Sequence, residues 1–241
     1  MSRTHKVVCT LTVALALALA SIAGAAPPPE ERCIAAKLDA QRKKRFCVAG
    51  AQRAAILGKT ADVAKCTAKF DKQIAAADKA AAAKGTSCRW LDNGDGTATD
   101  LSTGLQWELK TDDGSVHDKD NVYTWSAVID GRTPNGTAFT EFLHELDGGL
   151  TPGGVATPCF AGKCDWRLPE LGELRGLISV PYPDCTVAPC TTIIGPTAPA
   201  FHWTRTHLST EYTYAVGFGN GIYGNANNGL ALAARAVRTA D

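Results

Sequence analysis

Eight cysteines follow residue 25 of this 241-residue chain, and the way they pair limits the folds open to it. Residues 1–25 have the order of a secretory signal peptide: a charged start, an apolar run from Val7 to Ile22 and a small-residue end. The apolar run is shorter than the roughly 20 residues of a membrane-spanning helix, so we expect cleavage and no transmembrane anchor. Cleavage removes Cys9 and leaves an even number of cysteines, which predicts four disulfides in a secreted or periplasmic protein.

The first four cysteines lie in a segment of helical composition. Glu30 to Lys84 is rich in Ala, Lys, Arg, Asp and Gln and has no proline. Gly58 suits the position after a helix end, and Thr60 or Asp62 can cap the start of the next helix. Residues 26–88 are therefore predicted to form two antiparallel helices, and residues 89–241 a second unit.

The cysteine spacing is compatible with such a hairpin. Cys33 and Cys47 are 14 residues apart, and Cys66 and Cys88 are 22 apart. At 100° per residue, each pair returns to within about 40° of one helix face, which allows nested pairing, Cys47 with Cys66 and Cys33 with Cys88. The helical rises, about 21 Å and about 33 Å, agree only if the second helix ends near Gly85 and the chain folds back. Alanine-rich helices bury little apolar area, so we interpret this unit as a disulfide-stapled spacer.

The two units differ in charge. Glu30 to Cys88 contains thirteen Lys or Arg and six Asp or Glu, a net charge of +7, whereas Arg89 to Asp241 contains ten and eighteen, a net charge of −8. A basic arm of this kind can bind an anionic surface such as a polysaccharide or lipid headgroups, or it can lie against its own acidic body. The sequence leaves both alternatives open.

The second unit has the composition of a mixed α+β fold. All five tryptophans and all five tyrosines lie in it, with short strand-like runs between turns. Two stretches have a helical pattern: the first runs from Thr124 to Ile129 with a second turn of helix at Ala138–Leu146, and the second is Pro169–Ile178. Runs from Tyr212 to Arg238 are typical of strands around Gly/Asn turns.

Several blocks of this unit, taken in order, resemble one known family. They are DNGDGTATDLSTGLQWE, FLHELDGG leading to CFAGKCDWRLPELGELRGLI, FHWTRT, AVGFGNG and the closing ARAVR. From Trp90 to Arg238 the chain resembles the Lcl C-terminal domain family. The resemblance implies an exported bacterial domain of C-type-lectin-like topology, distantly related to the formylglycine-generating enzyme fold. The family's name-giving member is a collagen-like adhesin that attaches to sulfated glycans, but here a helical hairpin stands in place of the collagen repeat.

The acidic stretch from Asp92 to Asp100 raises the question of a calcium loop. If Gly96 were position 6 of a helix-loop-helix calcium loop, positions 1 and 12 would be Leu91 and Ser102, which supply no carboxylate. The Asn93-Gly94 and Asp95-Gly96 pairs are instead strong hairpin signals. We therefore expect a turn and no metal site, with a cation remaining the alternative if the fold adds an oxygen ligand from elsewhere.

Other conspicuous residues of the blocks are interpreted as structural. Asp165, Trp166 and Arg167 stand between a cysteine pair and a helix start, where Trp166 suits the core and Arg167 suits a partly buried ion pair. Trp107, Trp203 and Arg238 lie in the remaining blocks and are assigned the same role.

The last four cysteines form two closely spaced pairs. Cys159 with Cys164, and Cys185 with Cys190, can each close across a turn, and cross-pairing between the two loops is the alternative. Neither has the C-x-x-C spacing of a redox pair, and no pair can be assigned to copper.

No catalytic constellation emerges. The sequence has neither G-x-S-x-G nor H-E-x-x-H, and His144-Glu145 lacks the second histidine of a zinc site. His202 and His207 are five residues apart on an expected strand and turn, so their side chains should point in different directions, and at most one of them could serve as a ligand. We expect no enzyme, no cofactor and no metal.

A glycine-rich stretch near the end has the composition of a glycan or protein contact surface, because aromatic rings pack on sugar C–H groups and amides bond hydroxyls. The candidates are Tyr212, Tyr214, Asn220, Tyr223, Asn225, Asn227 and Asn228.

The sequence thus predicts a secreted, non-catalytic module that binds a glycan or a surface polymer and no nucleic acid. The alternatives are an enzyme of the formylglycine-generating type and a structural envelope protein whose basic hairpin docks to a partner. No feature of the sequence indicates an oligomeric state.

Overall fold

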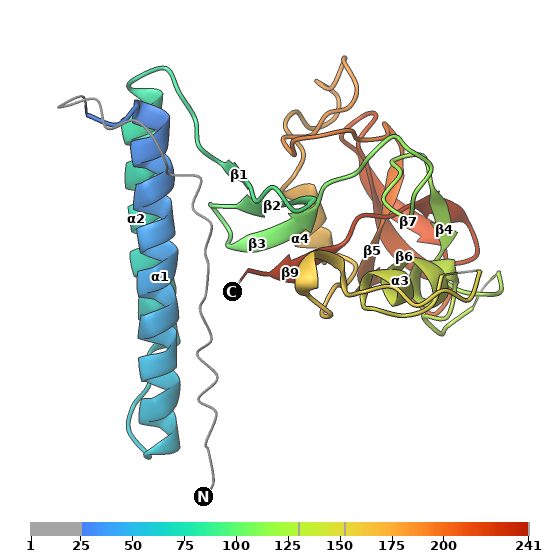
Figure 1. Ribbon diagram of the computed structural model, residues 1–241, viewed down its shortest axis with the longest axis horizontal. Helices are drawn as coiled ribbons and strands as arrows, with labels where there is room; N and C mark the ends of the chain where they lie inside the picture. Colours follow the sequence, from blue (N-terminus) through green and yellow to red (C-terminus); the bar gives the residue numbers. More distant parts are fainter. Residues whose placement is uncertain (1–25, 130, 152, 241) are drawn as a thin grey trace, which may run out of the picture.

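The computed structural model describes residues 26–129, 131–151 and 153–240, so the expected signal peptide and Cys9 lie outside the described residues. The chain is α+β, as predicted: a helical pair, α1 (Pro29–Ile56) and α2 (Val63–Ala82), stands beside a unit with two sheets (Figure 1). Among the described residues, no helix is both long and apolar enough to cross a membrane.

The hairpin has the turn and pairing that the sequence predicts. Gly58, with φ +69°, follows the end of α1, and the Asp62 carboxylate accepts the Lys65 N–H to cap α2. The structure contains the disulfides Cys33–Cys88 and Cys47–Cys66. Gly85, also at positive φ, ends the second helix, so the chain folds back to reach Cys33 as expected.

The second unit is built on two sheets. The first has the order β1-β2-β3-β9, and all neighbouring strands are antiparallel. The second has the order β4-β8-β5-β6-β7, in which β5 and β8 are parallel. The strands are β1 (Trp90–Asp92), β2 (Thr97–Asp100), β3 (Leu105–Glu108), β4 (Val122–Thr124), β5 (Phe201–His207), β6 (Tyr212–Gly217), β7 (Tyr223–Asn227), β8 (Ala231–Ala233) and β9 (Val237–Thr239).

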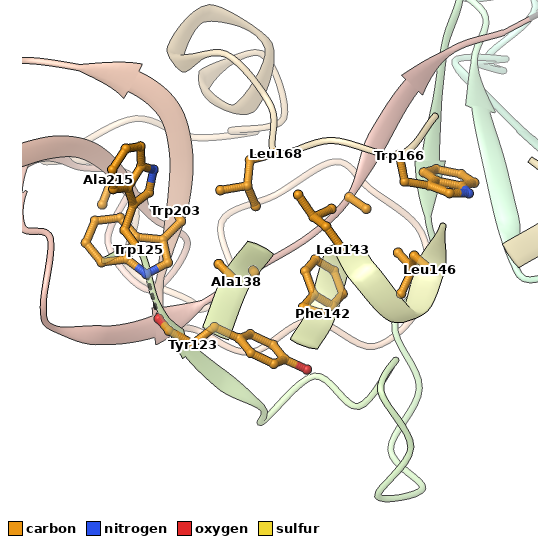
Figure 2. Packing of buried hydrophobic residues seen from close by; sticks show 12 residues of the cluster. Tyr123, Trp125, Ala138, Phe142, Leu143, Leu146, Trp166, Leu168, Trp203 and Ala215 are labelled. Carbon is orange, nitrogen blue, oxygen red and sulfur yellow. Dashed lines mark hydrogen bonds between the residues drawn. The ribbon is translucent and has the colours of Figure 1, made fainter. Parts of the chain in front are cut away.

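Two hydrophobic cores hold these sheets. The larger is centred on Trp125, Phe142 and Trp203, and the Trp203 indole N–H donates to the Tyr123 carbonyl at 2.7 Å (Figure 2). The smaller gathers Trp107, Leu174, Leu177, Ile193, Val216, Phe218 and Val237, and joins the first sheet to helix α4 (Leu171–Arg175). The α+β fold class is thereby confirmed, while the C-type-lectin-like topology stays a prediction.

The first predicted helical stretch is wrong in its part from Thr124, and the second forms a shorter helix than predicted. The chain from Thr124 is not helical, because the β4 strand ends there and the next two amides, Trp125 and Ser126, donate to the Asn228 carbonyl. Ala138–Leu146 is helical, as a π-helix (Ala138–Leu143) followed by α3 (His144–Leu146). The stretch predicted at Pro169–Ile178 is helical only over α4 (Leu171–Arg175). This helix begins after Glu170, which forms a capping box with Glu173.

The residues interpreted as structural are built into the frame. Trp107, Trp166 and Trp203 are buried. Arg167 binds both Glu173 oxygens at 2.7 Å, which explains its partial burial. Arg238 donates to Asp165 and to the Gln106 side chain, both at 2.6 Å.

The acidic stretch at the start of the domain forms a hairpin turn. Residues 93–96 connect β1 to β2, and Gly94 and Gly96 have the positive φ angles, +73° and +84°, that such turns require. The carboxylates of Asp92 and Asp95 accept backbone N–H groups of Gly94 and Thr97, as in Asx turns. These bonds give the acidic side chains a structural role in the turn.

His202 makes the stability of the domain depend on pH. Its ring is 1% exposed, donates from Nδ1 to the Ala200 carbonyl and packs on Phe218. Burial, with a further contribution from Arg235, lowers its pKa to about 3. An unfolded histidine has a pKa of about 6.5, so between about pH 6.5 and 3 the unfolded chain binds a proton that the native chain excludes. Stability is therefore lost as pH falls through this window.

We expect His202→Gln to remove this dependence. From pH 6.5 to pH 5 the histidine accounts for a loss of about 1.5 kcal/mol, which the variant should not show. Urea unfolding of both proteins at the two pH values measures the difference directly. His207→Gln, at an exposed histidine against Trp125, should retain the full dependence.

Candidate ligand-binding surface

The predicted aromatic and amide residues converge on one face of the β6–β7 hairpin. The register pairs Tyr212 with Asn227, Tyr214 with Asn225 and Val216 with Tyr223. Directly paired residues of antiparallel strands project from the same face of the sheet. Five of the seven predicted residues, Tyr212, Tyr214, Tyr223, Asn225 and Asn227, therefore form one strip, which we call the aromatic–amide strip.

The strip faces solvent while the opposite side of the hairpin is packed. Tyr223 and Asn225 are exposed, and Tyr212, Tyr214 and Asn227 are half-buried. On the other side, Ala215 belongs to the larger core and Ala226 packs against it. The hairpin thus presents aromatic rings from a backbone that the core holds in place.

A groove of about 490 Å³ continues the strip toward α4. Val216 and Ile178 supply apolar surface, and Tyr182, Tyr223 and Arg175 line its sides. The Arg175 guanidinium stacks 4.0 Å from the centre of the Tyr223 ring, a cation–π contact that holds both side chains at the edge of the groove.

Close backbone packing shapes the groove. Gly221, at φ +69°, brings the β6–β7 turn against the segment from Val180 to Tyr182, and a Cβ there would lie 2.6 Å from the Val180 carbonyl oxygen. The disulfide Cys185–Cys190 closes the loop that follows this segment. The Cys190 N–H donates to the Phe218 carbonyl at 2.6 Å and so holds the end of the loop against the sheet. The groove wall is therefore a fixed feature of the fold.

A family model described as the Lcl C-terminal domain matches residues 96–238, which is more than half of the chain. The chain belongs to the Lcl C-terminal domain family. No curated protein and no solved structure matches it. Membership and four disulfides fit an extracellular or periplasmic location.

Asn227 lies on the strip, although its side-chain oxygen accepts the Gly229 N–H at 3.0 Å. Two other predicted residues, Asn220 and Asn228, serve only the fold of this Lcl C-terminal domain. The Asn220 side-chain oxygen accepts the Ile222 N–H inside the turn. Asn228 is fully buried, and its amide nitrogen donates to the Gly131 carbonyl at 2.8 Å. We therefore leave both out of the strip.

Sequence reasoning missed the residues that complete the groove. Arg175 lies at the end of α4 and Tyr182 in the loop beyond it, far from the β6–β7 hairpin in sequence. The available sequence signal for Tyr182 was its position between two prolines, in Pro181-Tyr182-Pro183. Nothing local in the sequence indicates that Arg175 meets Tyr223.

Other polar clusters of the domain are structural in geometry. Asp112, Asp118 and Asp120 lie together, but the Lys119 ammonium is 2.9 Å from Asp112 and 2.7 Å from Asp120. The His144 Nε2 accepts the Leu150 N–H. Cys159 and Cys164 also pair, so the eight cysteines among the described residues are all in disulfides.

Proposed function

We propose that this protein is a non-catalytic binding module that recognises a glycan through the aromatic–amide strip and the adjoining groove. The observation that carries the proposal is the β6–β7 register, which places Tyr212 and Tyr214 opposite Asn227 and Asn225, with Tyr223 on the same face of the hairpin. The Lcl C-terminal domain resemblance supports the same class of ligand.

The chemistry of the strip suits a sugar. Tyrosine rings offer an apolar face to the C–H groups of a pyranose, and their hydroxyls remain available to water or ligand. Asn225 lies directly across from Tyr214, so an amide with both donors and an acceptor stands beside the ring. Together they supply the apolar platform and the directional hydrogen bonds that a carbohydrate requires.

The groove adds room for one end of the ligand and a cation. Its volume of about 490 Å³ lies within the range of small-molecule sites, roughly 300–1,000 Å³. Arg175 presents a guanidinium that can bind a sulfate or carboxylate group with two parallel hydrogen bonds. An acidic or sulfated sugar would therefore place its anionic group here.

Disulfide pairing favours binding over the alternative of a formylglycine-generating enzyme. That chemistry uses a cysteine pair that binds copper as thiolate. All eight cysteines among the described residues are instead paired in disulfides. A quantitative thiol assay on the exported protein should find no reactive thiol if the binding proposal holds.

Removing the aromatic strip should weaken glycan binding by about tenfold or more, since buried aromatic contacts dominate recognition surfaces. We expect this for Tyr212→Ala/Tyr214→Ala, assayed on an array of neutral and sulfated oligosaccharides and then by titration calorimetry with the best ligand. Arg175→Gln should weaken anionic ligands more than neutral ones.

The matched control is Phe46→Ala, which removes an exposed aromatic ring from helix α1, outside the proposed binding surface. It should bind as the unmodified protein does. The proposal fails if no oligosaccharide is retained at low salt, or if the double tyrosine variant, shown by circular dichroism to be folded, binds with unchanged affinity.

A further inference from the structure

The free end of the α1–α2 hairpin carries exposed apolar side chains. We define the hairpin tip as residues 53–65, the end of α1, the turn and the start of α2. Ile56 is 84% exposed, Leu57 61% and Val63 43%. Three large apolar residues are thus exposed within eight positions of one turn region, whereas single exposed apolar residues are common and need no explanation.

The net positive charge of the α1–α2 hairpin comes from the half that ends in this tip. Residues 42–72 contain nine Lys or Arg and two Asp, a net charge of +7. The rest of the hairpin, residues 26–41 and 73–88, contains four basic and four acidic residues and is neutral. At the tip itself, Asp62 is occupied in capping α2, and Arg53, Lys59 and Lys65 are exposed.

The tip projects away from the domain. Gln41 on α1 donates to the Leu101 carbonyl of the domain, and Ile56 follows 15 residues later, about 22 Å along the helix. Figure 1 shows the two helices as a rod whose α1–α2 turn lies well below the sheets. Basic charge and apolar side chains are therefore both placed at an end of the hairpin that projects away from the sheets.

We propose that the hairpin tip docks on an anionic lipid surface, with Ile56, Leu57 and Val63 entering the headgroup region and the surrounding cations contacting lipid phosphates. A convex apolar end cannot enclose a ligand, but a lipid interface deforms around it. Anionic lipid attracts clustered lysines and arginines close to the surface. An anionic polysaccharide would use the charges and leave these apolar side chains in water, so lipid explains both features.

Vesicle sedimentation tests the proposal with the chain from Ala26 onward, so that the expected signal peptide contributes nothing. We expect binding to vesicles of phosphatidylcholine with about 30% phosphatidylglycerol, weakening with salt, and little binding to phosphatidylcholine alone. Ile56→Ser/Leu57→Ser/Val63→Ser and Lys59→Gln/Lys65→Gln should each lower the partition coefficient about tenfold or more.

Matched variants separate the tip from general effects of charge and exposure. Lys79→Gln/Lys84→Gln removes two exposed lysines from the neutral half, and Val155→Ser/Val187→Ser/Leu208→Ser removes three exposed apolar residues from the domain. Both should bind vesicles normally, as should the double tyrosine variant, because the glycan surface lies on the other unit. Equal loss with the matched variants, absence of vesicle binding, or binding only to dextran sulfate would overturn the proposal.

Discussion

Replacing Glu108 by Gln is expected to lower the free energy of unfolding by about 3–5 kcal/mol, because it leaves a buried ammonium without its counter-charge. Glu108 is 0% exposed and sits at the end of β3. One carboxylate oxygen lies 2.9 Å from both the Lys110 ammonium and the His117 Nδ1, and the other accepts the Ala236 N–H at 3.0 Å.

The electrostatics explain the size of this effect. Burial by itself raises the pKa of Glu108, but Lys110 and His117 more than offset it, so the pKa lies below its ordinary value and the group is ionised. Burial lowers the pKa of Lys110, and Glu108 opposes that change. Arg235, fully buried, donates to the Glu108 carbonyl at 2.8 Å and adds a second cation nearby. Glu108 thus supplies the negative charge that stabilises the buried Lys110 and Arg235 cations in the core.

A double variant distinguishes a stranded charge from lost packing. Glu108→Gln/Lys110→Met removes both charges at similar volume and should recover at least half of the stability that Glu108→Gln loses. Glu211→Gln, at an exposed glutamate, should change the free energy by less than about 0.5 kcal/mol. Urea unfolding at pH 7 measures all three, and a loss below about 1 kcal/mol for Glu108→Gln would contradict the interpretation.

The hairpin could be predicted in detail because its signals are local. Helix composition, Gly58 after the first helix, Asp62 at the start of the second and the 100° arithmetic of the cysteines all act within a few turns of one element. The hairpin turn at residues 93–96 was predictable for the same reason.

The errors and omissions arise where contacts between segments distant in the sequence determine the local structure. Thr124 resembles a helix cap in sequence, yet its N–H donates to the Thr137 hydroxyl and its own hydroxyl accepts the Thr137 N–H, so it ends strand β4 and starts no helix. The Glu108 cluster joins β3 to residues 235 and 236, over 120 positions away, and no pattern in the sequence announces it. Tertiary contacts of this kind override local propensity.

The candidate site combines residues that local sequence signals indicate with residues that only tertiary contacts bring to it. The composition of this stretch, tyrosine and asparagine among glycines, predicted a contact surface of seven residues, and the β6–β7 register brings five of them to one face. Arg175 and Tyr182 come from a helix and a loop that meet the hairpin only in the folded chain. The residues of the strip could therefore be named from the sequence, whereas their arrangement on one face and the adjoining groove could not.

Removing the Cys33–Cys88 disulfide should cost about 4 kcal/mol, whereas removing Cys159–Cys164 should cost about 2 kcal/mol. The first closes a loop with a sequence separation of 55 and the second a separation of 5, so the entropy restored to the unfolded chain is larger for the first. We expect this from Cys33→Ala/Cys88→Ala and Cys159→Ala/Cys164→Ala in denaturant unfolding.

The first variant should also uncouple the two units. Cys33–Cys88 ties α1 to the segment that enters β1, and without it the hairpin is held to the domain by contacts such as Lys37 with Ser102 and Gln41 with Leu101. All five tryptophans lie in the domain, so their fluorescence reports its unfolding, while the circular dichroism at 222 nm reports mainly α1 and α2. The helical signal should then be lost at lower denaturant than the fluorescence signal. Coincident transitions in this variant would show that the helices and the domain unfold as one unit without the disulfide.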